Sequence, residues 1–430
     1  MLSAVEKTAA IRQAFPPEGF FLNKDWLISP EAFPIDSRLT AQLEKLGHRL
    51  HLFNRACNEL YLRSVSGKQP AWIAAYLDRG KPPELIEFAR RKEFRNALPQ
   101  VIRPDLVLTE EGFTIAELDS VPGGIGLTAW FNETYSQFGE DVLGGARGMI
   151  EGFDAIAPGA DILVSEESAT YRPEMEWLAQ RTNQRVHAAE TYSPPKAGPQ
   201  NIYRFFENFD YPNLPGLPAL REGAQSGALR ISPPLKPYLE EKMWFALFWM
   251  QPLREFWRRE LGEKHFSELQ KHIPYTWILD PAPLPHYAVL PGLEINSWEE
   301  LGRFSQKQRD LILKISGFSE LGWGSRSVIL GSDVSQIEWQ SHIAHALSEF
   351  SEHPYILQRF HKGRIIEHPF LNPDTGSIEP LRGRVRLCPY YFVLEDKAQL
   401  RGALATICPA DKKLLHGMKD AILVPTAVRD

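Results

Sequence analysis

Two short β-forming runs that carry charged side chains at alternate positions constrain the fold more than any other feature of the sequence. The first run holds Arg103 and Asp105, the second holds Glu117 and Asp119, and Glu110-Glu111-Gly112 separates them. Alternate side chains point to the same face of a strand, so the charged residues of each run share a face. The segment therefore predicts a hairpin with one charged face.

The expected register of this hairpin brings the charges together. A three-residue loop with Gly112 in the left-handed conformation pairs Thr109 with Phe113, and Asp105 with Glu117. Opposed β-carbons lie about 5 Å apart, so the three carboxylates converge beside the arginine. Carboxylates that close repel unless a cation lies between them, and a hard divalent ion such as Mg²⁺, completed by phosphate oxygens, meets that need. The register is an assumption, and on spacing alone a solvated hairpin face with ordinary charges accounts for the same residues.

Before the hairpin, the pattern is mostly helical. Apolar residues recur at spacings of three and four over 39–62, which predicts an amphipathic helix. Residues 71–77 and 84–95 predict two more helices, separated by Pro82-Pro83. We therefore expect residues 1–95 to form a helical N-terminal region.

After the hairpin, an α/β pattern begins. Residues 161–165 and 185–189 have the pattern of strands and 172–184 that of a helix, which predicts a strand–helix–strand unit of the parallel type. Residues 193–237 are rich in Pro and Gly and are expected to connect two halves of the chain. The chain then divides into an α/β half with the hairpin and the substrate region, 96–235, and a second half, 236–430.

The second half mixes helices and strands. Ser297 with Glu300, and Ser335 with Glu338, are spaced as capping boxes at the starts of helices. Strand patterns cover residues 311–315, 327–330, 355–360, 384–387 and 390–394. The predicted class is therefore α/β, or α+β, with mixed sheets.

A lysine and a glycine-rich loop lie together in this half. Lys314 interrupts an apolar strand, where a buried ammonium without a partner is costly. The following segment, Gly317 to Ser327, has the composition of a mobile flap that covers phosphates, although it lacks the ending of a P-loop. An edge-strand lysine that reaches water beside a long hairpin is an equally good interpretation.

Two further motifs suggest anion binding. Arg382, Arg384 and Arg386 share one strand face at period two, and a row of arginines suits phosphate or carboxylate contacts. An exposed basic edge strand explains the row equally well. The turn 121–126 contains Gly123, Gly124 and Gly126, which let backbone N–H groups approach an anion, but a plain tight turn has the same composition.

Composition excludes several classes of protein. The net charge is −6, so a basic nucleic-acid-binding face is not expected. Three cysteines favour thiols in a reducing compartment over a disulfide framework. The longest apolar run, Met243–Met250, is far shorter than the about 20 residues of a membrane span. We therefore expect a soluble cytoplasmic protein with no nucleic-acid or membrane partner.

In their order along the chain, these elements resemble the circularly permuted ATP-grasp ligases. The nearest family is that of the glutathionylspermidine synthetase-like proteins, and the eukaryotic glutathione synthetases are more distant. Arg103-Pro104-Asp105 matches the Arg-x-Asp element of that family, and Glu117-Leu118-Asp119 matches its Glu-x-Asn. The resemblance implies that Arg103 contacts the transferring phosphate and that Asp105, Glu117 and Asp119 hold Mg²⁺.

The resemblance also assigns the nucleotide side of the site. Pro233-Pro234-Leu235-Lys236 with Glu241-Lys242 resembles the segment of the first ATP lysine, which makes Lys242 the match, and Lys314 matches the second. The strand 355–360 resembles the one that passes the adenine. The resemblance makes Arg386 a late ATP-contacting arginine. The other nucleotide-binding residues that it implies in this half are Lys242, Lys314, Gly322, Gly324, Ser325, Gln358 and Phe360.

These residues imply an ATP- and Mg²⁺-dependent carboxylate–amine ligase that forms an amide through an acyl phosphate. Its partners would be a small-molecule or peptide carboxylate and an amine, and related ligases are often homodimers. The chain departs from the pattern at Asp119, where asparagine is usual, and at the turn Pro122-Gly123-Gly124. These departures keep two alternatives open, namely a nucleotide-binding protein without catalysis, regulatory or scaffolding, and kinase chemistry on the same scaffold.

Overall fold

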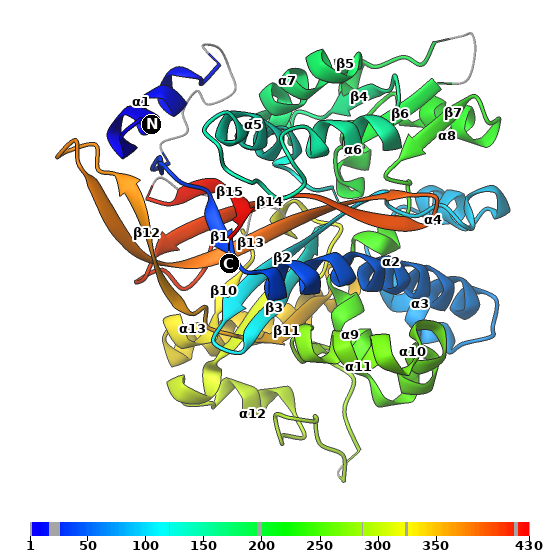
Figure 1. The fold of residues 1–430 in the computed structure, drawn as a ribbon. Coiled ribbons are helices and arrows are strands. Elements are labelled where there is room, and N and C mark those ends of the chain that lie inside the picture. The colour runs from blue at the N-terminus through cyan, green and yellow to red at the C-terminus, as the bar shows by residue number, and fades with distance from the viewer. Residues whose placement is uncertain are drawn as a thin grey trace.

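The structure is a computed structural model, and it describes residues 2–16, 26–119, 121–195, 200–285, 287–322, 326–416 and 420–429. Three sheets organise these residues into a mixed α/β fold (Figure 1). A mixed seven-stranded sheet lies at the centre, a parallel four-stranded sheet lies at one end, and an antiparallel four-stranded sheet lies at the other. The predicted class, with mixed sheets, is confirmed.

The central sheet has the order β1-β15-β14-β13-β2-β3, and β12 pairs with β13 beside this path. Its neighbours are antiparallel except for β1 and β15, which are parallel. Two predicted strands, 384–387 and 390–394, are parts of one long strand, β13. The bounds are β1 (Phe33–Ile35), β2 (Val101–Thr109), β3 (Gly112–Asp119), β12 (Ile365–Leu371), β13 (Ile378–Leu394), β14 (Lys397–Pro409) and β15 (Ile422–Val428).

The β2–β3 hairpin has the expected pairing of charged residues, but its loop length and its register near the loop differ from the prediction. Thr109 pairs with Gly112, so the loop has two residues and the expected pairing of Thr109 with Phe113 is wrong. The register then shifts between Asp105 and Leu106, which leaves Ala116 of β3 without an opposite residue. This β-bulge restores the pairing of Asp105 with Glu117, which the sequence predicted.

The parallel sheet has the order β5-β4-β6-β7, and its first two strands confirm the predicted parallel unit. The stretch 193–237, expected to be a connection, contains two of the strands and a helix. Those of its prolines that the structure describes lie between these elements or in a first helical turn, where a missing N–H costs little. The bounds are β4 (Asp161–Val164), β5 (Arg185–Ala188), β6 (Gln200–Phe205) and β7 (Leu229–Ser232), with α5 (Ile125–Ser136), α6 (Gly148–Ile156), α7 (Arg172–Thr182) and α8 (Leu217–Gln225).

The antiparallel sheet has the order β10-β9-β11-β8. Its helix α13 begins at the predicted capping box of Ser335 and Glu338, whereas the side chain of Ser297 makes no capping bond to α12. The Glu300 carboxylate instead accepts from the N–H of Asn296. The bounds are β8 (Thr276–Ile278), β9 (Leu311–Ile315), β10 (Ile329–Leu330), β11 (Tyr355–Arg359), α12 (Trp298–Gly302) and α13 (Gln336–Ser348).

Among the remaining helices, α2 and α11 contact the central sheet, α3 and α10 contact α2, and α9 contacts β8 and β11 of the antiparallel sheet. The predicted helices over 39–62 and 71–77 are confirmed as α2 and α3, while the one over 84–95 is the shorter α4 followed by a 3₁₀ turn. The bounds are α1 (Ala4–Gln13), α2 (Ser37–Val65), α3 (Ala71–Leu77), α4 (Pro83–Ala89), α9 (Met243–Trp249), α10 (Arg254–Leu261) and α11 (Glu263–His272). The 3₁₀ segments are Lys92–Phe94, Ala169–Tyr171, Ala189–Thr191, Asn208–Asn213, Pro237–Glu240, Gln251–Leu253, Gln306–Arg309, Glu320–Gly322, Gly331–Asp333 and Glu349–Ser351.

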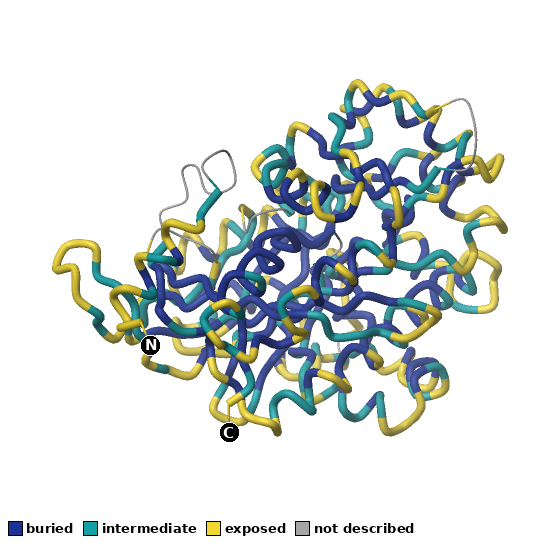
Figure 2. The backbone as a smooth tube through the Cα atoms, turned by 45° about the horizontal axis from the view of Figure 1, so that its top comes forward, coloured by how far each residue is buried: buried dark blue, intermediate teal, exposed yellow. Residues whose placement is uncertain are grey.

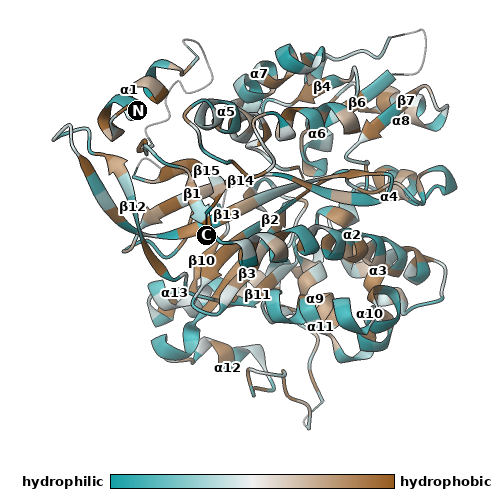
Figure 3. Ribbon diagram, in the orientation of Figure 1, coloured by the Kyte–Doolittle hydropathy of each residue, from teal (hydrophilic) through white to brown (hydrophobic). Residues whose placement is uncertain are grey.

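One large apolar core joins the central sheet to the helices of the N-terminal region. Buried residues run along the sheet and α2 (Figure 2), and hydropathy follows the same division, with apolar strands inside and polar outer helix faces (Figure 3). The aromatic run of α9 belongs to this core. Among the described residues, no helix combines the length and apolarity that a membrane crossing requires. The boundaries at residues 95 and 235 stay a prediction.

Candidate active site

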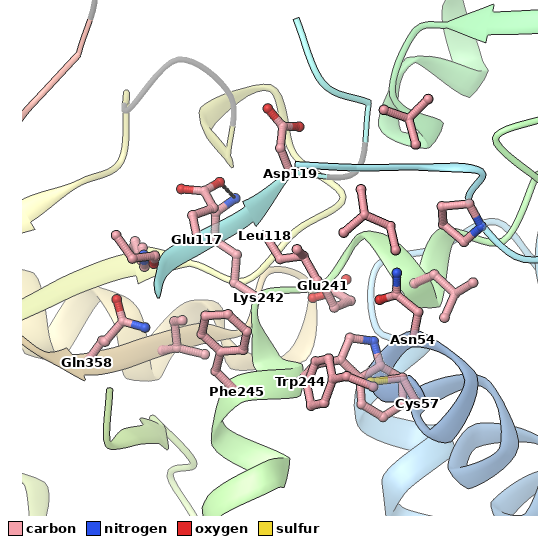
Figure 4. A pocket seen from close by; sticks show the side chains of 18 residues that line it. Asn54, Cys57, Glu117, Leu118, Asp119, Glu241, Lys242, Trp244, Phe245 and Gln358 are labelled. Atoms are coloured by element: carbon pink, nitrogen blue, oxygen red, sulfur yellow. Dashed lines mark hydrogen bonds and ion pairs between the residues drawn. The ribbon is translucent and has the colours of Figure 1, made fainter. Parts of the chain in front are cut away.

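Five of the predicted site residues line a cavity between the central sheet, the antiparallel sheet and α2. Its walls come from the end of the β2–β3 hairpin, from α2 and α9, and from β9 and β11 (Figure 4). Glu117, Asp119, Lys242, Lys314 and Gln358 all line it, although they come from distant parts of the sequence. The cavity has a volume of about 30 Å³, which leaves room for only about one or two water molecules. A nucleotide can therefore enter only if the walls move apart.

Lys242 forms an ion pair with the hairpin. Its ammonium lies 3.0 Å from Glu117 Oε1, the contact that Figure 4 marks with a dashed line. It also donates to the carbonyl oxygen of Gly322, at 3.1 Å. Burial alone would lower the pKa of Lys242, but Glu117 and Glu207 outweigh it and the pKa is raised. Lys242 is therefore a cation at this site.

Lys314 is buried in the antiparallel sheet, with 4% of its surface exposed. Because β9 lies between β10 and β11, it is not an edge strand, and the interpretation of Lys314 as a snorkelling residue is wrong. Its ammonium donates to the carbonyl oxygen of Ala116, at 3.0 Å. Burial lowers the pKa of Lys314 to about 8, since the neighbouring Lys242 adds to the effect and Glu117 only partly opposes it.

Arg103 connects two of the three carboxylates. Its Nη2 lies 3.0 Å from Asp105 Oδ1 and 2.5 Å from Asp119 Oδ2. Its Nη1 donates to the carbonyl oxygen of Gly123, at 3.0 Å. Burial raises the pKa of Asp119, and the nearby carboxylates of Asp105 and Glu117 add to that increase against the effect of Arg103.

Asp105 has two further partners on β13. Arg386 Nη1 lies 3.2 Å from Asp105 Oδ2, and the thiol of Cys388 donates to Oδ1 at 3.4 Å. Burial works to raise the pKa of Asp105, but Arg103 and Arg386 overcome it and the pKa is lowered. Burial, followed by the Asp105 charge, raises the pKa of Cys388 to about 12, so this thiol stays protonated.

The three carboxylates predicted to bind metal thus each contact a cation of the protein itself. Asp105 and Asp119 contact arginine and Glu117 contacts lysine. No three His, Cys, Asp or Glu side chains of the described ranges are placed to hold a metal ion together. The carboxylate oxygens are nevertheless the ligand type that Mg²⁺ requires, and they lie on adjacent strands. The three carboxylates therefore fit Mg²⁺ once the arginine and lysine side chains that now contact them bind other anions.

The row of three arginines does not converge on this site. The guanidinium of Arg384 is buried and donates to backbone carbonyls, among them Gly363 and Lys412, both at 3.0 Å. Arg382 is exposed. Only Arg386 of the three contacts a site carboxylate among the ion pairs of the described residues, so the prediction of a shared anion site is wrong. Backbone carbonyls satisfy Arg384 where an anion was expected.

The glycine-rich turn after β3 already holds an anionic group. The carboxylate of Glu174 accepts from the N–H of Gly124 at 2.7 Å and of Leu127 at 2.9 Å. Gly124 is the N-cap residue of α5 and Leu127 lies in its first turn, and a carboxylate stabilises this end of a helix. Gly124 has a φ of +83°, which suits glycine. The anion expected at this turn is therefore a side chain of the protein.

The other predicted nucleotide contacts lie at different depths. Gln358 is buried in the cavity wall, and its amide donates to the hydroxyl of Thr276 at 3.3 Å. Phe360 lies beyond the end of β11 and does not line the cavity, and its N–H donates to the carbonyl of Asp310. Gly322 touches the site through its carbonyl. Gly324 and Ser325 lie outside the described residues.

Two acidic residues of the site carried no recognisable signal in the sequence. Glu241 lines the cavity and forms a buried ion pair with Lys81 of the N-terminal region. Glu207 follows β6, and burial raises its pKa well above the ordinary value, with Glu240 and Asp119 adding to the increase. Glu241 stands next to the predicted Lys242, but nothing local indicates that Lys81 is its partner.

Comparisons with known proteins support the fold. No protein-family model matches the sequence, and no curated protein matches it. The structure is similar to that of a glutathione synthetase-like effector from Globodera pallida in its apo form, with a TM-score of 0.52, 11% identity, and coverage of 99% of this chain and 97% of that one. At this identity the similarity shows a shared fold alone. The circular permutation and the glutathionylspermidine branch stay predictions.

A second solved structure is less similar. It is a protein from Methylobacillus flagellatus provisionally assigned as a gamma-glutamylcysteine synthetase, with 12% identity, coverage of 89% of this chain and 87% of that one, and a TM-score of 0.37. A TM-score this low establishes no shared fold.

Proposed function

We propose that the protein is an ATP- and Mg²⁺-dependent ligase that joins a carboxylate to an amine through an acyl phosphate. The observation that carries the proposal is the set of reciprocal ion pairs around the hairpin. Two arginines and one lysine neutralise three carboxylates, and a second, buried lysine contacts only a neutral carbonyl among its hydrogen bonds in the described residues. In a magnesium nucleotide, the phosphates can replace the carboxylates as partners of the arginines and lysines. The Mg²⁺ ion can in turn replace these cations as the partner of the carboxylates.

The cations would bind phosphate oxygens. Lys242 and Lys314 approach the hairpin from α9 and β9, and they would hold the α- and β-phosphates. Arg103 and Arg386 both contact Asp105, and they would stabilise the transferring group. A planar guanidinium suits this task because it binds two oxygens at once.

The carboxylates released by this exchange would hold Mg²⁺. Asp105, Glu117 and Asp119 supply the oxygen ligands, and the ion would supply charge neutralisation at the phosphates. The chain positions the groups. The substrate carboxylate attacks the terminal phosphorus and ADP leaves, and the amine then attacks the acyl carbon and phosphate leaves. The apolar walls that line much of the cavity would limit the access of water to the acyl phosphate.

The test compares two carboxylates of the same hairpin. Glu117→Gln should abolish ADP release in a screen of acids and amines, because it removes a metal ligand and the partner of Lys242. The control is Glu111→Gln at the exposed loop, which should act as wild type. Equal activity of Glu117→Gln and wild type would contradict the assignment.

One observation favours a second candidate, a nucleotide-binding protein without catalysis. Asp119 stands where the resembling family has asparagine, and it is tied to Arg103 at 2.5 Å. An extra negative charge that holds the catalytic arginine would oppose phosphoryl transfer. ATP binding without ADP release, across a broad panel of acids and amines, would support this candidate.

A further inference from the structure

A buried ion pair connects the N-terminal region to the candidate site. Lys81 lies in the link between α3 and α4, and its side chain is 1% exposed. Its ammonium donates to one carboxylate oxygen of Glu241, which is 2% exposed. The hydroxyl of Ser316 donates to the other oxygen of the same carboxylate. The three residues lie far apart in the sequence, so tertiary structure alone brings them together.

This cluster fixes the backbone of Lys242. The carbonyl of Ser316 accepts from the N–H of Lys242 at 2.7 Å, and its hydroxyl accepts from the N–H of Met243 at 2.9 Å. Glu241 precedes Lys242 directly. The side chain of Ser316 therefore joins the Lys81–Glu241 pair to the start of α9, from which Lys242 reaches Glu117.

The same cluster fixes the start of the loop after β9. A Cβ atom on Gly317 would lie 2.7 Å from the carbonyl oxygen of Glu240 and 3.0 Å from the carboxyl carbon of Glu241, so the loop leaves the sheet in close contact with that segment. The Lys81 ammonium also lies 5.4 Å from the centre of the Phe318 ring. The loop continues to Gly322, whose carbonyl accepts from Lys242.

The backbone of Lys81 is held in turn. A Cβ atom on Gly80 would come within 2.1 Å of the carbonyl oxygen of Glu352, so only glycine allows this approach. Gly80 also has a φ of +66°, which glycine adopts without strain. Lys81 thus projects from a fixed point toward Glu241.

Stability alone gives little reason for such a pair. Two buried charges lose their hydration, and well-packed apolar residues often serve equally well. We propose that Lys81 is a positioning residue of the nucleotide site, which acts through Glu241 and Ser316 to set the place of Lys242 and of the loop from Gly317 to Gly322. This inference rests on the proposed function, because it assigns Lys81 a part in nucleotide binding.

Three variants test the proposal. Lys81→Met removes the ammonium but strands the Glu241 carboxylate, so Lys81→Met/Glu241→Gln removes both charges and protects folding. Lys81→Arg keeps the charge. The control is Lys92→Met, an exposed lysine of the same region. The readouts are ATP affinity, from binding titrations with Mg²⁺, and hydrogen exchange at the amides of Lys242 and Met243 without nucleotide.

The proposal expects Lys81→Met and Lys81→Met/Glu241→Gln to bind ATP at least tenfold more weakly and to exchange at these two amides at least tenfold faster. Lys81→Arg should recover most of the affinity, and Lys92→Met should match wild type. A purely structural pair predicts a lower melting temperature with ATP affinity unchanged, and that result would overturn the proposal, as would wild-type exchange in the double variant. If wild type itself binds no nucleotide, the proposed function fails, whereas the exchange data still decide whether Lys81 fixes the Lys242 segment.

Discussion

The ammonium of Lys314 lies 3.0 Å from the carbonyl oxygen of Ala116, the residue that the β-bulge leaves without an opposite partner. A neutral carbonyl stabilises a buried ammonium less than a carboxylate does. Lys314 therefore remains the least neutralised cation of the site, with its pKa lowered to about 8 by burial. A phosphate group would be a stronger partner, and this difference favours nucleotide binding at this place.

The first prediction concerns pH. Phosphate binding needs Lys314 protonated, so ATP affinity should fall by up to about tenfold per pH unit above pH 8. Lys314→Met should bind weakly at every pH without that fall, and Lys314→Arg should retain affinity to higher pH. Titrations between pH 7 and 9.5 measure this. An affinity of wild type that is constant over the range would contradict the role of Lys314.

The same shift has the opposite effect on stability. The folded pKa of Lys314 is below its unfolded value of about 10.5, so the unfolded chain binds more protons between pH 8 and 10.5. The contribution of Lys314 to stability should therefore become more favourable as pH rises through this window. Comparing the pH dependence of the free energy of unfolding for wild type and Lys314→Met isolates the contribution of Lys314, because the variant lacks the titrating amine.

The second prediction concerns Asp119. Asp119→Asn removes one negative charge and frees Arg103 from its 2.5 Å contact, while Arg103 keeps Asp105. ATP binding without Mg²⁺ should become stronger, by about tenfold, because less negative charge faces the phosphates. The gain with Mg²⁺ should be smaller, since the variant would also weaken the proposed Mg²⁺ site. Affinities measured with and without Mg²⁺ would contradict this if the variant bound metal-free ATP more weakly.

The third prediction separates two neighbouring arginines. Arg386→Ala should lower turnover by 100-fold or more with a small effect on melting, because under the proposed function its guanidinium would stabilise the transferring phosphoryl group, while Asp105 keeps its contact with Arg103. Arg384→Ala should lower the free energy of unfolding by about 2–3 kcal/mol, because it leaves buried carbonyls unsatisfied, with ATP affinity unchanged. Turnover assays, melting curves and ATP titrations of both variants distinguish these outcomes, and a reversal would refute the assignment.

The fourth prediction concerns the internal cap of α5. Glu174→Gln removes the charge from two buried contacts with the N–H groups of Gly124 and Leu127. The free energy of unfolding should fall by about 1–3 kcal/mol. The matched control is Glu176→Gln, at an exposed position of α7, the helix that also carries Glu174. This variant should change the free energy of unfolding by no more than about 0.5 kcal/mol. Equal stability of the two variants would show that the cap contributes little.

Much of the local structure could be predicted from the sequence. Apolar periodicity and capping residues located α2, α3 and α13, and the strand pattern at 311–315 coincides with β9. The parallel unit of β4 and β5 was recognisable because a helix separates two apolar runs. These features depend on neighbours in the sequence.

The parts that could not be predicted depend on contacts between distant residues. The Arg384 guanidinium meets carbonyls of Gly363 and Lys412, which no strand pattern indicates. The prolines of 193–237 suggested a connection, because composition does not show where they lie relative to β6 and α8. For the site, charge spacing identified Asp105 opposite Glu117, but the cation partners depend on how β9, α9 and β13 pack against the hairpin.

The β-bulge has a consequence for how such chains can be compared. If Ala116 were deleted, Ile115 and Glu117 would become consecutive, and the hairpin would be regular with Asp105 still opposite Glu117. The carboxylates would keep their face, while the carbonyl that receives Lys314 would disappear. The residue at 116 contributes this contact through its backbone carbonyl. In an alignment, this part of the site would be recorded as a gap of one residue and not as a preserved letter.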